Sequence, residues 1–147
     1  MIYQVTKTWG PELGLSCCFR QWRAESHCRF LHGYALGIRI VFEAASLDAR
    51  HWVYDFGNLA WLKQSLIDAF DHTTLIAADD PERAVFEDLA RRGLIQLRIV
   101  PAVGCEAFSE WILMQHADQI QQETQGRVKI HSVEVFEHQA NSARILA

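Results

Sequence analysis

Two stretches of the chain alternate hydrophobic and polar residues, which is the pattern of a β-strand with one buried face. They cover residues 13–19 and residues 36–42. Residues 21–33 lie between them and are rich in arginine and histidine, so we predict a functional loop there rather than a core segment. The alternating hydrophobic positions are Leu13, Leu15, Cys17 and Phe19 in the first stretch, and Leu36, Ile38, Ile40 and Phe42 in the second.

Two longer stretches repeat their hydrophobic residues every three or four positions, which predicts amphipathic helices. The first helix is expected over about residues 57–70, with Asp55 or Asn58 as its N-cap. The second is expected to begin near Gly104 or Cys105, to end before residues 125–126 and to be the longest helix. The hydrophobic positions are Leu59, Leu62, Leu66, Ile67 and Phe70 in the first helix, and Phe108, Trp111, Ile112 and Ile120 in the second.

The segment between these helices, residues 76–103, has the character of an insertion. A short helix is predicted from Pro81 to Gly93, and a brief strand over residues 95–100. A final strand is predicted over about residues 128–137, in which the hydrophobic side switches between Ile130 and Val133, so either a bulge or burial on both faces is required. Strands and helices in this order predict an α+β fold, in one domain over residues 1–147.

Composition narrows the class of protein and its partners. The 147 residues carry a net charge of −4, so we expect no nucleic-acid partner, because duplex binding needs a broad basic surface. No hydrophobic run approaches the roughly 20 residues needed to span a bilayer, and the N-terminus lacks the apolar stretch of a signal peptide. We therefore expect no membrane partner and a cytoplasmic location, in which the four cysteines stay reduced.

The densest group of reactive side chains lies at residues 26–34. Cys28 stands beside histidine and arginine residues, whose positive charge favours the thiolate, so it is a candidate nucleophile or general base. The alternative is an inert cysteine that serves only as a small hydrophobic residue. Arg20, Arg23 and Arg29 crowd the same stretch and form either an anion pocket or part of a solvated loop.

Two further groups could take part in the same chemistry. Asp71 and His72 follow the first predicted helix, where a carboxylate beside an imidazole forms a proton relay that operates near neutral pH. The alternative is a histidine that interacts only with the helix end. Glu137 stands at the end of the last predicted strand, where a buried carboxylate could hold the amino-pyrimidinone edge of a pterin, although most strand-end glutamates are solvated.

In this order, these groups resemble the motifs of the 6-pyruvoyl-tetrahydropterin synthase / 6-carboxytetrahydropterin synthase family, which are F-x-A-A-H, C-x-x-x-H-G-H, D-F, D-H, P-T-x-E and E-T. Residues 28–34 match the second motif, residues 55–56 the third and residues 71–72 the fourth. Residues 104–106 fall on the P-T-x-E region, and Glu137 falls on the glutamate of E-T. The resemblance runs from residue 13 to residue 137, and several short motifs in register are far more specific than one.

The resemblance implies a T-fold, an antiparallel β-sheet with two main helices packed on one face. In that fold the sheets of neighbouring subunits join into a barrel, which implies a homo-oligomer, a hexamer on the family pattern, with active sites between subunits. The family's substrate is the pterin triphosphate 7,8-dihydroneopterin triphosphate. On that pattern the catalytic residues are Cys28, Asp71 and His72, and the substrate-binding residues are Glu137, Cys105 and Glu106.

The family also implies zinc bound by three histidines, and here the chain departs from the pattern. His32 is kept, whereas Cys17 stands where F-x-A-A-H has its histidine, and Tyr34 replaces the last histidine of H-G-H. A thiolate is a good zinc ligand, but a phenol is a poor one at neutral pH. We expect either a rebuilt zinc site of His32, Cys17 and a nearby third donor, His27 or Cys18, or no zinc at all.

The resulting interpretation is a pterin-forming lyase that resembles 6-carboxytetrahydropterin synthase. It would convert 7,8-dihydroneopterin triphosphate to a 6-substituted tetrahydropterin in queuosine, 7-deazaguanine or pterin biosynthesis. Two alternatives stay open: a related enzyme that acts on a different pterin, and a non-catalytic T-fold module that binds a pterin or purine. Retention of Cys28 and of the Asp71/His72 pair favours catalysis, whereas the altered zinc ligands argue against the standard form.

Overall fold

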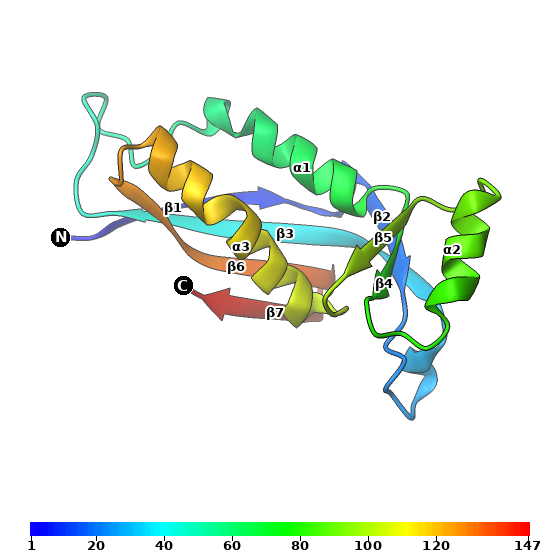
Figure 1. Ribbon diagram of the computed structural model, residues 1–147. Helices are drawn as coiled ribbons and strands as arrows, with labels where there is room; N and C mark the ends of the chain where they lie inside the picture. Colours follow the sequence, from blue (N-terminus) through cyan, green and yellow to red (C-terminus); the bar gives the residue numbers. More distant parts are fainter.

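Seven strands form one sheet in the computed structural model, which describes all 147 residues (Figure 1). The strands are β1 (Tyr3–Trp9), β2 (Leu15–Phe19), β3 (His32–Ala44), β4 (Thr73–Ala77), β5 (Leu97–Val100), β6 (Val128–His138) and β7 (Asn141–Leu146). The α-helices are α1 (Ala60–Phe70), α2 (Arg83–Arg91) and α3 (Cys105–Glu123). Short 3-10 helices are η1 (Pro11–Leu13), η2 (His27–Arg29) and η3 (Phe56–Leu59).

β3 is the central strand because its hydrophobic residues alternate along most of its length. Leu36, Ile38, Ile40 and Phe42 are fully buried, so the strand predicted over residues 36–42 is confirmed and extends at both ends. β3 pairs antiparallel with β2 and β1 along one edge and with β6 along the other. The strand order is β5-β4-β2-β3-β6-β7, and β4 runs parallel to both of its neighbours. The sheet is therefore antiparallel in its larger part and mixed at one end.

The two main helices pack on one face of the sheet. Figure 1 shows α1 and α3 over the same face, whereas α2 lies beside β4 and β5 at one end. Their predicted hydrophobic positions include residues that are fully buried in the core, namely Leu62, Leu66 and Phe70 of α1, and Phe108, Ile112 and Ile120 of α3. The α+β class with two main helices on one face is thus confirmed. No helix combines the length and the apolar character needed to cross a membrane.

Phe108 of α3 ties the helices to the sheet, and its loss should be costly. Its ring packs against Phe19 at 5.1 Å and against Phe70 at 5.3 Å between centroids. Phe108→Ala should lower the free energy of unfolding by about 3–5 kcal/mol, because it removes these contacts and leaves a cavity. Met114 on the same helix is 71% exposed, so Met114→Ala should cost less than about 0.5 kcal/mol. Equal losses for the two variants in urea unfolding would contradict this packing.

A β-bulge accounts for the switch of hydrophobic side in β6. Val41 pairs with Ser132 and the next residue of β3, Phe42, pairs with Ile130, so His131 is an extra residue in β6. An extra residue returns the following side chains to the original face. Val128, Ile130, Val133 and Val135 are consequently all buried, and Ser132 and Glu134 on the other face are buried as well, so the bulge and burial on both faces are both present.

The ends of several elements differ from prediction for local reasons. The first strand begins at Leu15 and not at residue 13, because Pro11–Leu13 is a 3-10 turn closed by Gly14 at a φ of 77°. The first helix begins at Ala60, because Asp55 caps η3 by accepting a hydrogen bond from Gly57 N–H at 2.9 Å. Within residues 76–103 the predicted helix and strand are both confirmed, as α2 and β5.

Candidate functional site

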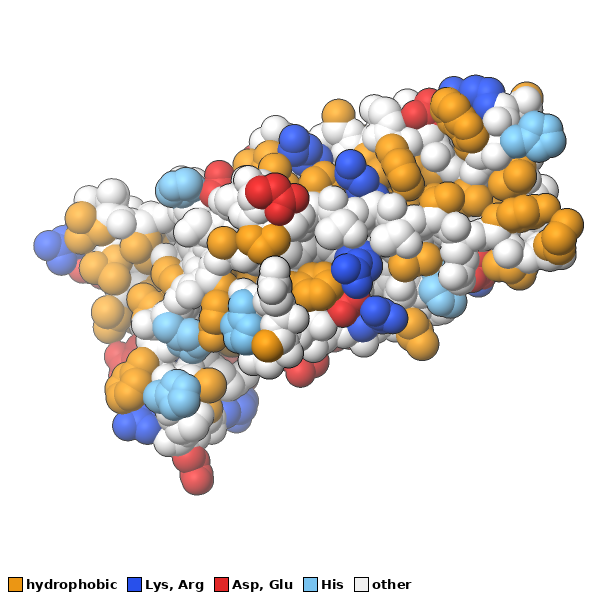
Figure 2. Space-filling model, turned by 180° about the vertical axis from the view of Figure 1, so that it is seen from behind, with side chains coloured by type: hydrophobic (Ala, Val, Ile, Leu, Met, Phe, Trp, Pro, Cys, Tyr) orange, Lys and Arg blue, Asp and Glu red, His pale blue; other side chains and the backbone are white.

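Reactive side chains from three strands, a loop and a helix meet around the ring of Tyr34. We call this group the Tyr34 cluster; its members are Phe19, Cys28, His32, Tyr34, Cys105, Glu137 and His138. It lies at the end of the sheet nearest β2, and Figure 2 shows histidine side chains gathered at that end of the molecule. The cluster unites the first and third groups of residues that we singled out in the sequence.

β2 and β3 supply the aromatic part of the cluster. Their antiparallel register pairs Phe19 with His32, and alternation along β3 places Tyr34 on the same side. The ring centroids of Phe19 and His32 are 5.8 Å apart, those of Phe19 and Tyr34 6.0 Å, and those of His32 and Tyr34 5.4 Å. Phe19 was missed as a site residue, although counting the alternation of the two strands from Leu15 and Leu36 would have placed it opposite His32.

β6 supplies a carboxylate and a second imidazole through a second irregularity. Its pairing with β7 shifts register between Phe136 and His138, and such bulges re-aim side chains. The ring of His138 lies 6.3 Å from that of Tyr34. Burial raises the pKa of Tyr34, and the negative charge of the Glu137 carboxylate raises it further. Glu137 forms no ion pair and is half-buried, which leaves its carboxylate free for a ligand.

Cys28 reaches the cluster from the loop that joins β2 and β3. It lies in η2, where its backbone N–H donates to Ser26 Oγ at 3.4 Å and its carbonyl accepts from Gln21 N–H at 3.0 Å. The Cys28 side chain is half-buried. It also raises the pKa of Tyr34, by less than the burial of the phenol and the charge of Glu137 do. The predicted catalytic cysteine and the predicted pterin anchor therefore both raise the pKa of the same phenol.

The N-terminus of α3 packs behind Glu137. Burial, followed by the charges of Glu137 and Glu106, raises the pKa of Cys105 to about 12, so this residue is a neutral thiol at ordinary pH. It is buried, whereas Glu106 is exposed in the first turn of the helix. Cys105 thus supports the position of Glu137, and direct contact of Cys105 or Glu106 with a substrate stays a prediction.

Asp71 and His72 form their predicted pair outside the cluster. Asp71 Oδ1 and His72 Nδ1 are 2.7 Å apart, and the His72 side chain is 78% exposed. The parallel register of β2 with β4 places His72 level with Ser16, just before β4 begins, where the backbone of His72 is left-handed with a φ of 55°. His72 lines an open hollow of about 520 Å³ together with Cys18, Thr74 and Tyr34. Within one chain Tyr34 is the one cluster member that lines this hollow, so it alone connects the Asp71/His72 pair with the cluster.

The predicted zinc donors do not converge. No three or more His, Cys, Asp or Glu side chains are grouped so that they could hold a metal ion. Cys17 is buried in the hydrophobic core, and burial, chiefly, raises the pKa of its thiol to about 12. His27 is exposed in η2, and His32 directs Nδ1–H to the Phe30 carbonyl at 2.6 Å. These side chains do not fit a three-donor site, so no step below is assigned to a metal, and zinc binding stays a prediction.

Two of the three arginines near Cys28 are paired with carboxylates, and the third is bonded to a backbone carbonyl. Arg20 makes two hydrogen bonds to Asp80, at 2.7 and 2.8 Å, and Arg23 donates to Asp79 at 2.6 Å. Arg29 donates to the Glu25 carbonyl at 2.8 Å and stacks on its neighbour's ring. An anion pocket built from all three guanidinium groups is therefore not formed in the single chain.

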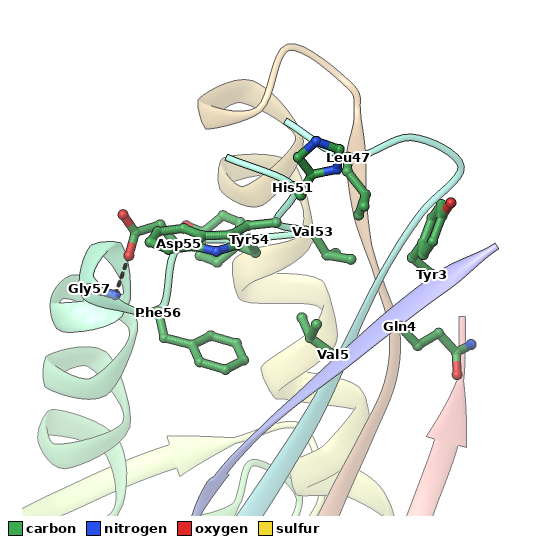
Figure 3. A pocket seen from close by; sticks show the side chains of 11 residues that line it. Tyr3, Gln4, Val5, Leu47, His51, Val53, Tyr54, Asp55, Phe56 and Gly57 are labelled. Atoms are coloured by element: carbon green, nitrogen blue, oxygen red, sulfur yellow. Dashed lines mark hydrogen bonds between the residues drawn. The ribbon is translucent and has the colours of Figure 1, made fainter. Parts of the chain in front are cut away.

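A second cavity of about 520 Å³ lies at the opposite end of β1 (Figure 3). It is mainly apolar and lies between β1 and the loop that leads to α1, with Val5, Leu47, Trp52 and Phe56 in its wall. No member of the Tyr34 cluster lines it. Its wall contains residues 55–56, which matched the D-F motif in the sequence. Asp55 caps η3 and forms an ion pair with Arg50 at 3.0 Å, so its role in this chain is structural.

A mostly antiparallel sheet that carries two long helices on one face defines a protein of the T-fold class. Residues 12–147 match the family model described as 6-pyruvoyl tetrahydropterin synthase. The chain belongs to the 6-pyruvoyl tetrahydropterin synthase family.

Individual relatives agree with this assignment. The 6-carboxy-5,6,7,8-tetrahydropterin synthase of Rickettsia typhi is 37% identical over 59 residues, which are 40% of this chain and 43% of that relative. The match thus spans less than half of that curated protein. An uncharacterized protein of Wolinella succinogenes has a similar structure, with a TM-score of 0.84 and 24% identity over 99% of this chain and 98% of the other. The 6-pyruvoyl tetrahydropterin synthase of Plasmodium falciparum has a TM-score of 0.68 and 15% identity, over 98% and 96%.

Proposed function

We propose that this protein is a pterin-forming lyase of the 6-carboxytetrahydropterin synthase type, which converts 7,8-dihydroneopterin triphosphate to a 6-substituted tetrahydropterin. The observation that supports it is the group around Tyr34, in which a strand-end carboxylate without an ion-pair partner and a loop thiol both raise the pKa of one phenol. A pterin ring held by the Glu137 carboxylate would present its side chain to the Cys28 thiol. Family membership supports the class of substrate.

Glu137 would hold the pterin ring. A pterin presents two adjacent N–H groups on its amino-pyrimidinone edge, and a carboxylate accepts both in parallel, as it does from a guanidinium. The bulge in β6 aims Glu137 at the cluster, and Cys105 fills the space behind it. The half-buried position strengthens such bonds because water competes less for the carboxylate.

Cys28 would move protons on the bound substrate, and the Asp71/His72 pair would complete the relay. Asp71 can orient the His72 ring and stabilise its protonated form through their 2.7 Å contact. Since Tyr34 is the one cluster residue that shares a hollow with the pair in one chain, we propose that a second copy brings its own pair to the site. β1 and β7 each leave one edge without a partner strand, and such edges are templates for pairing between chains. Light scattering of the purified protein should therefore give a multiple of the 16.9 kDa chain.

Glu137→Ala should weaken pterin binding by about 100-fold or more, because two hydrogen bonds to a charged acceptor contribute about 1.5–3 kcal/mol each. The measurement is calorimetric titration with 7,8-dihydroneopterin. Glu110 is exposed in the second turn of α3, outside the cluster, so Glu110→Ala serves as the matched control and should bind normally. Unchanged affinity in Glu137→Ala would remove the proposed anchor.

The main experiment is to incubate metal-analysed protein with 7,8-dihydroneopterin triphosphate and identify the products by mass. A carboxy- or pyruvoyl-tetrahydropterin supports the lyase, and binding without conversion supports a non-catalytic pterin-binding module. A related enzyme acting on a pterin without the triphosphate is the second candidate, because Arg20 and Arg23 are engaged by Asp80 and Asp79 and are not free for phosphate. Parallel incubation with 7,8-dihydroneopterin separates these two enzymes.

A further inference from the structure

The loop that carries Cys28 has one strong attachment outside itself. Residues 20–31 join β2 to β3, and the loop lies beside the turn that follows β4 (Figure 1). One backbone hydrogen bond closes the loop onto the cysteine, from Gln21 N–H to the Cys28 carbonyl at 3.0 Å, beside short-range bonds within its turns. Trp22 packs against the hydrophobic core, but η2 around Cys28 has no buried residue, so this part of the loop needs further contacts to hold one conformation.

Arg20 and Asp80 supply that contact through a fork of hydrogen bonds. Arg20 Nε donates to Asp80 Oδ2 at 2.8 Å, and Arg20 Nη2 donates to Asp80 Oδ1 at 2.7 Å. The third guanidinium nitrogen, Nη1, is directed at the Arg29 carbonyl at 3.4 Å. One guanidinium therefore links the end of β2, the turn after β4 and the residue that follows Cys28.

The carboxylate side of this contact is fixed. The Asp80 side chain is 0% exposed, and its Oδ1 also accepts from Glu82 N–H at 2.8 Å at the start of the turn into α2. Removing one partner from a buried pair leaves an uncompensated charge, so such a pair holds its geometry tightly. The Arg20 guanidinium also keeps the pKa of Asp80 below its ordinary value.

A neighbouring pair provides the contrast. Arg23 donates to Asp79 at 2.6 Å, one residue before Asp80, but these side chains are 64% and 55% exposed. Exposed pairs contribute little because water and salt screen them. The two pairs join the same loop to the same turn and differ in burial, so one is a natural control for the other.

We propose that Arg20 and Asp80 are positioning residues for Cys28, and that the inserted segment at residues 76–103 serves the site by providing this buried anchor. The proposal rests on the proposed function only in treating Cys28 as the group that acts on substrate. The anchoring of the loop itself is a property of the fold. The insertion then has a defined task, which is to fix the thiol relative to Tyr34 and Glu137.

The experiment compares Asp80→Asn with Asp79→Asn in the full chain. The first readout is independent of turnover: hydrogen exchange of the amides of residues 21–31, together with the rate of Cys28 alkylation by iodoacetamide, followed by peptide mass spectrometry. In Asp80→Asn both rates should rise by about tenfold, because the loop opens more often. In Asp79→Asn they should stay within about twofold of the wild type, since an exposed pair holds little.

The second readout is turnover. Asp80→Asn should lower kcat by about 10- to 100-fold with KM nearly unchanged, as expected for a misplaced catalytic group. If Asp80→Asn does not fold, Arg20→Lys is used instead, because it keeps the positive charge but cannot make both hydrogen bonds to Asp80. The same increases in exchange and alkylation rates and the same fall in kcat are expected for it. Wild-type exchange and alkylation rates in the loop of a folded variant overturn the proposal. If the wild type shows no turnover but Asp80→Asn still loses protection in the loop, the anchoring role of Arg20 and Asp80 stands and only the proposed reaction is rejected.

Discussion

Cys28→Ala should reduce turnover of 7,8-dihydroneopterin triphosphate by at least about 100-fold, because a positioned acid or base contributes about 10²–10⁴ to the rate. The thiol lies beside the Tyr34 phenol, facing the position where Glu137 would hold the ring. Binding of the ring depends on Glu137, so the dissociation constant of the pterin should stay within about threefold. Product formation is measured by mass, and binding by calorimetry.

The matched control for this experiment is Cys18→Ser. Cys18 is a half-buried cysteine on the other face of β2, where its sulfur contacts Thr74 Oγ1 at 3.2 Å, a contact that a hydroxyl can replace. Its turnover should stay close to that of the wild type. Near-normal turnover by Cys28→Ala would refute the assigned role, and equal losses in both variants would point to damage to β2 instead.

Elements with a clear hydrophobic period could be predicted from the sequence. The alternation in β3 and the three- and four-residue spacing in α1 and α3 reflect one buried face each, and the structure buries those residues. The switch between Ile130 and Val133 required a bulge or burial on both faces, and the sheet has both, a bulge at His131 and buried residues on both faces over residues 132–135. The spacing of hydrophobic residues is enough to predict an element when that element buries one face against one core.

Three strands escaped prediction because their pattern depends on their neighbours. All five residues of β4 are buried, so the strand shows no alternation, as expected for a parallel strand covered on both sides. β7 is a short edge strand, and most of its residues are exposed. β1 places Lys7 on its partly buried side, which breaks the hydrophobic alternation of the N-terminus.

In the candidate site too, short motifs identified individual residues, whereas their relative positions depend on how distant strands pair. Cys28, His32 and Glu137 were identified by motif, and the structure brings them to one phenol. The sequence could not predict that Glu137 is absent from the hollow of the Asp71/His72 pair, because it does not show that β2 and β3 lie between β4 and β6. Strand order and register are set by pairing rather than by composition.

The rings of Phe19, His32 and Tyr34 lie close to one another, and this arrangement predicts that histidines at positions 19 and 34 would create a zinc site. Three imidazoles on one tetrahedral zinc, with Zn–N distances of about 2.0–2.1 Å, have ring centroids roughly 5 Å apart. The three rings here are separated by 5.4–6.0 Å. His32 already directs Nδ1–H to a backbone carbonyl, which orients the ring and leaves Nε2 as a lone-pair donor. The backbone is thus arranged for three donors, of which the chain supplies one.

Phe19→His combined with Tyr34→His should therefore raise zinc affinity by about 1,000-fold or more, whatever affinity the wild type has. Structural zinc sites gain about 10–16 kcal/mol from four ligands, so two added imidazoles contribute several kcal/mol. Competition with a chromophoric chelator measures the affinity, and adding His32→Ala to the pair should abolish the gain. Equal zinc affinity in the double variant and the wild type would show that β2 and β3 do not hold these three positions around one point.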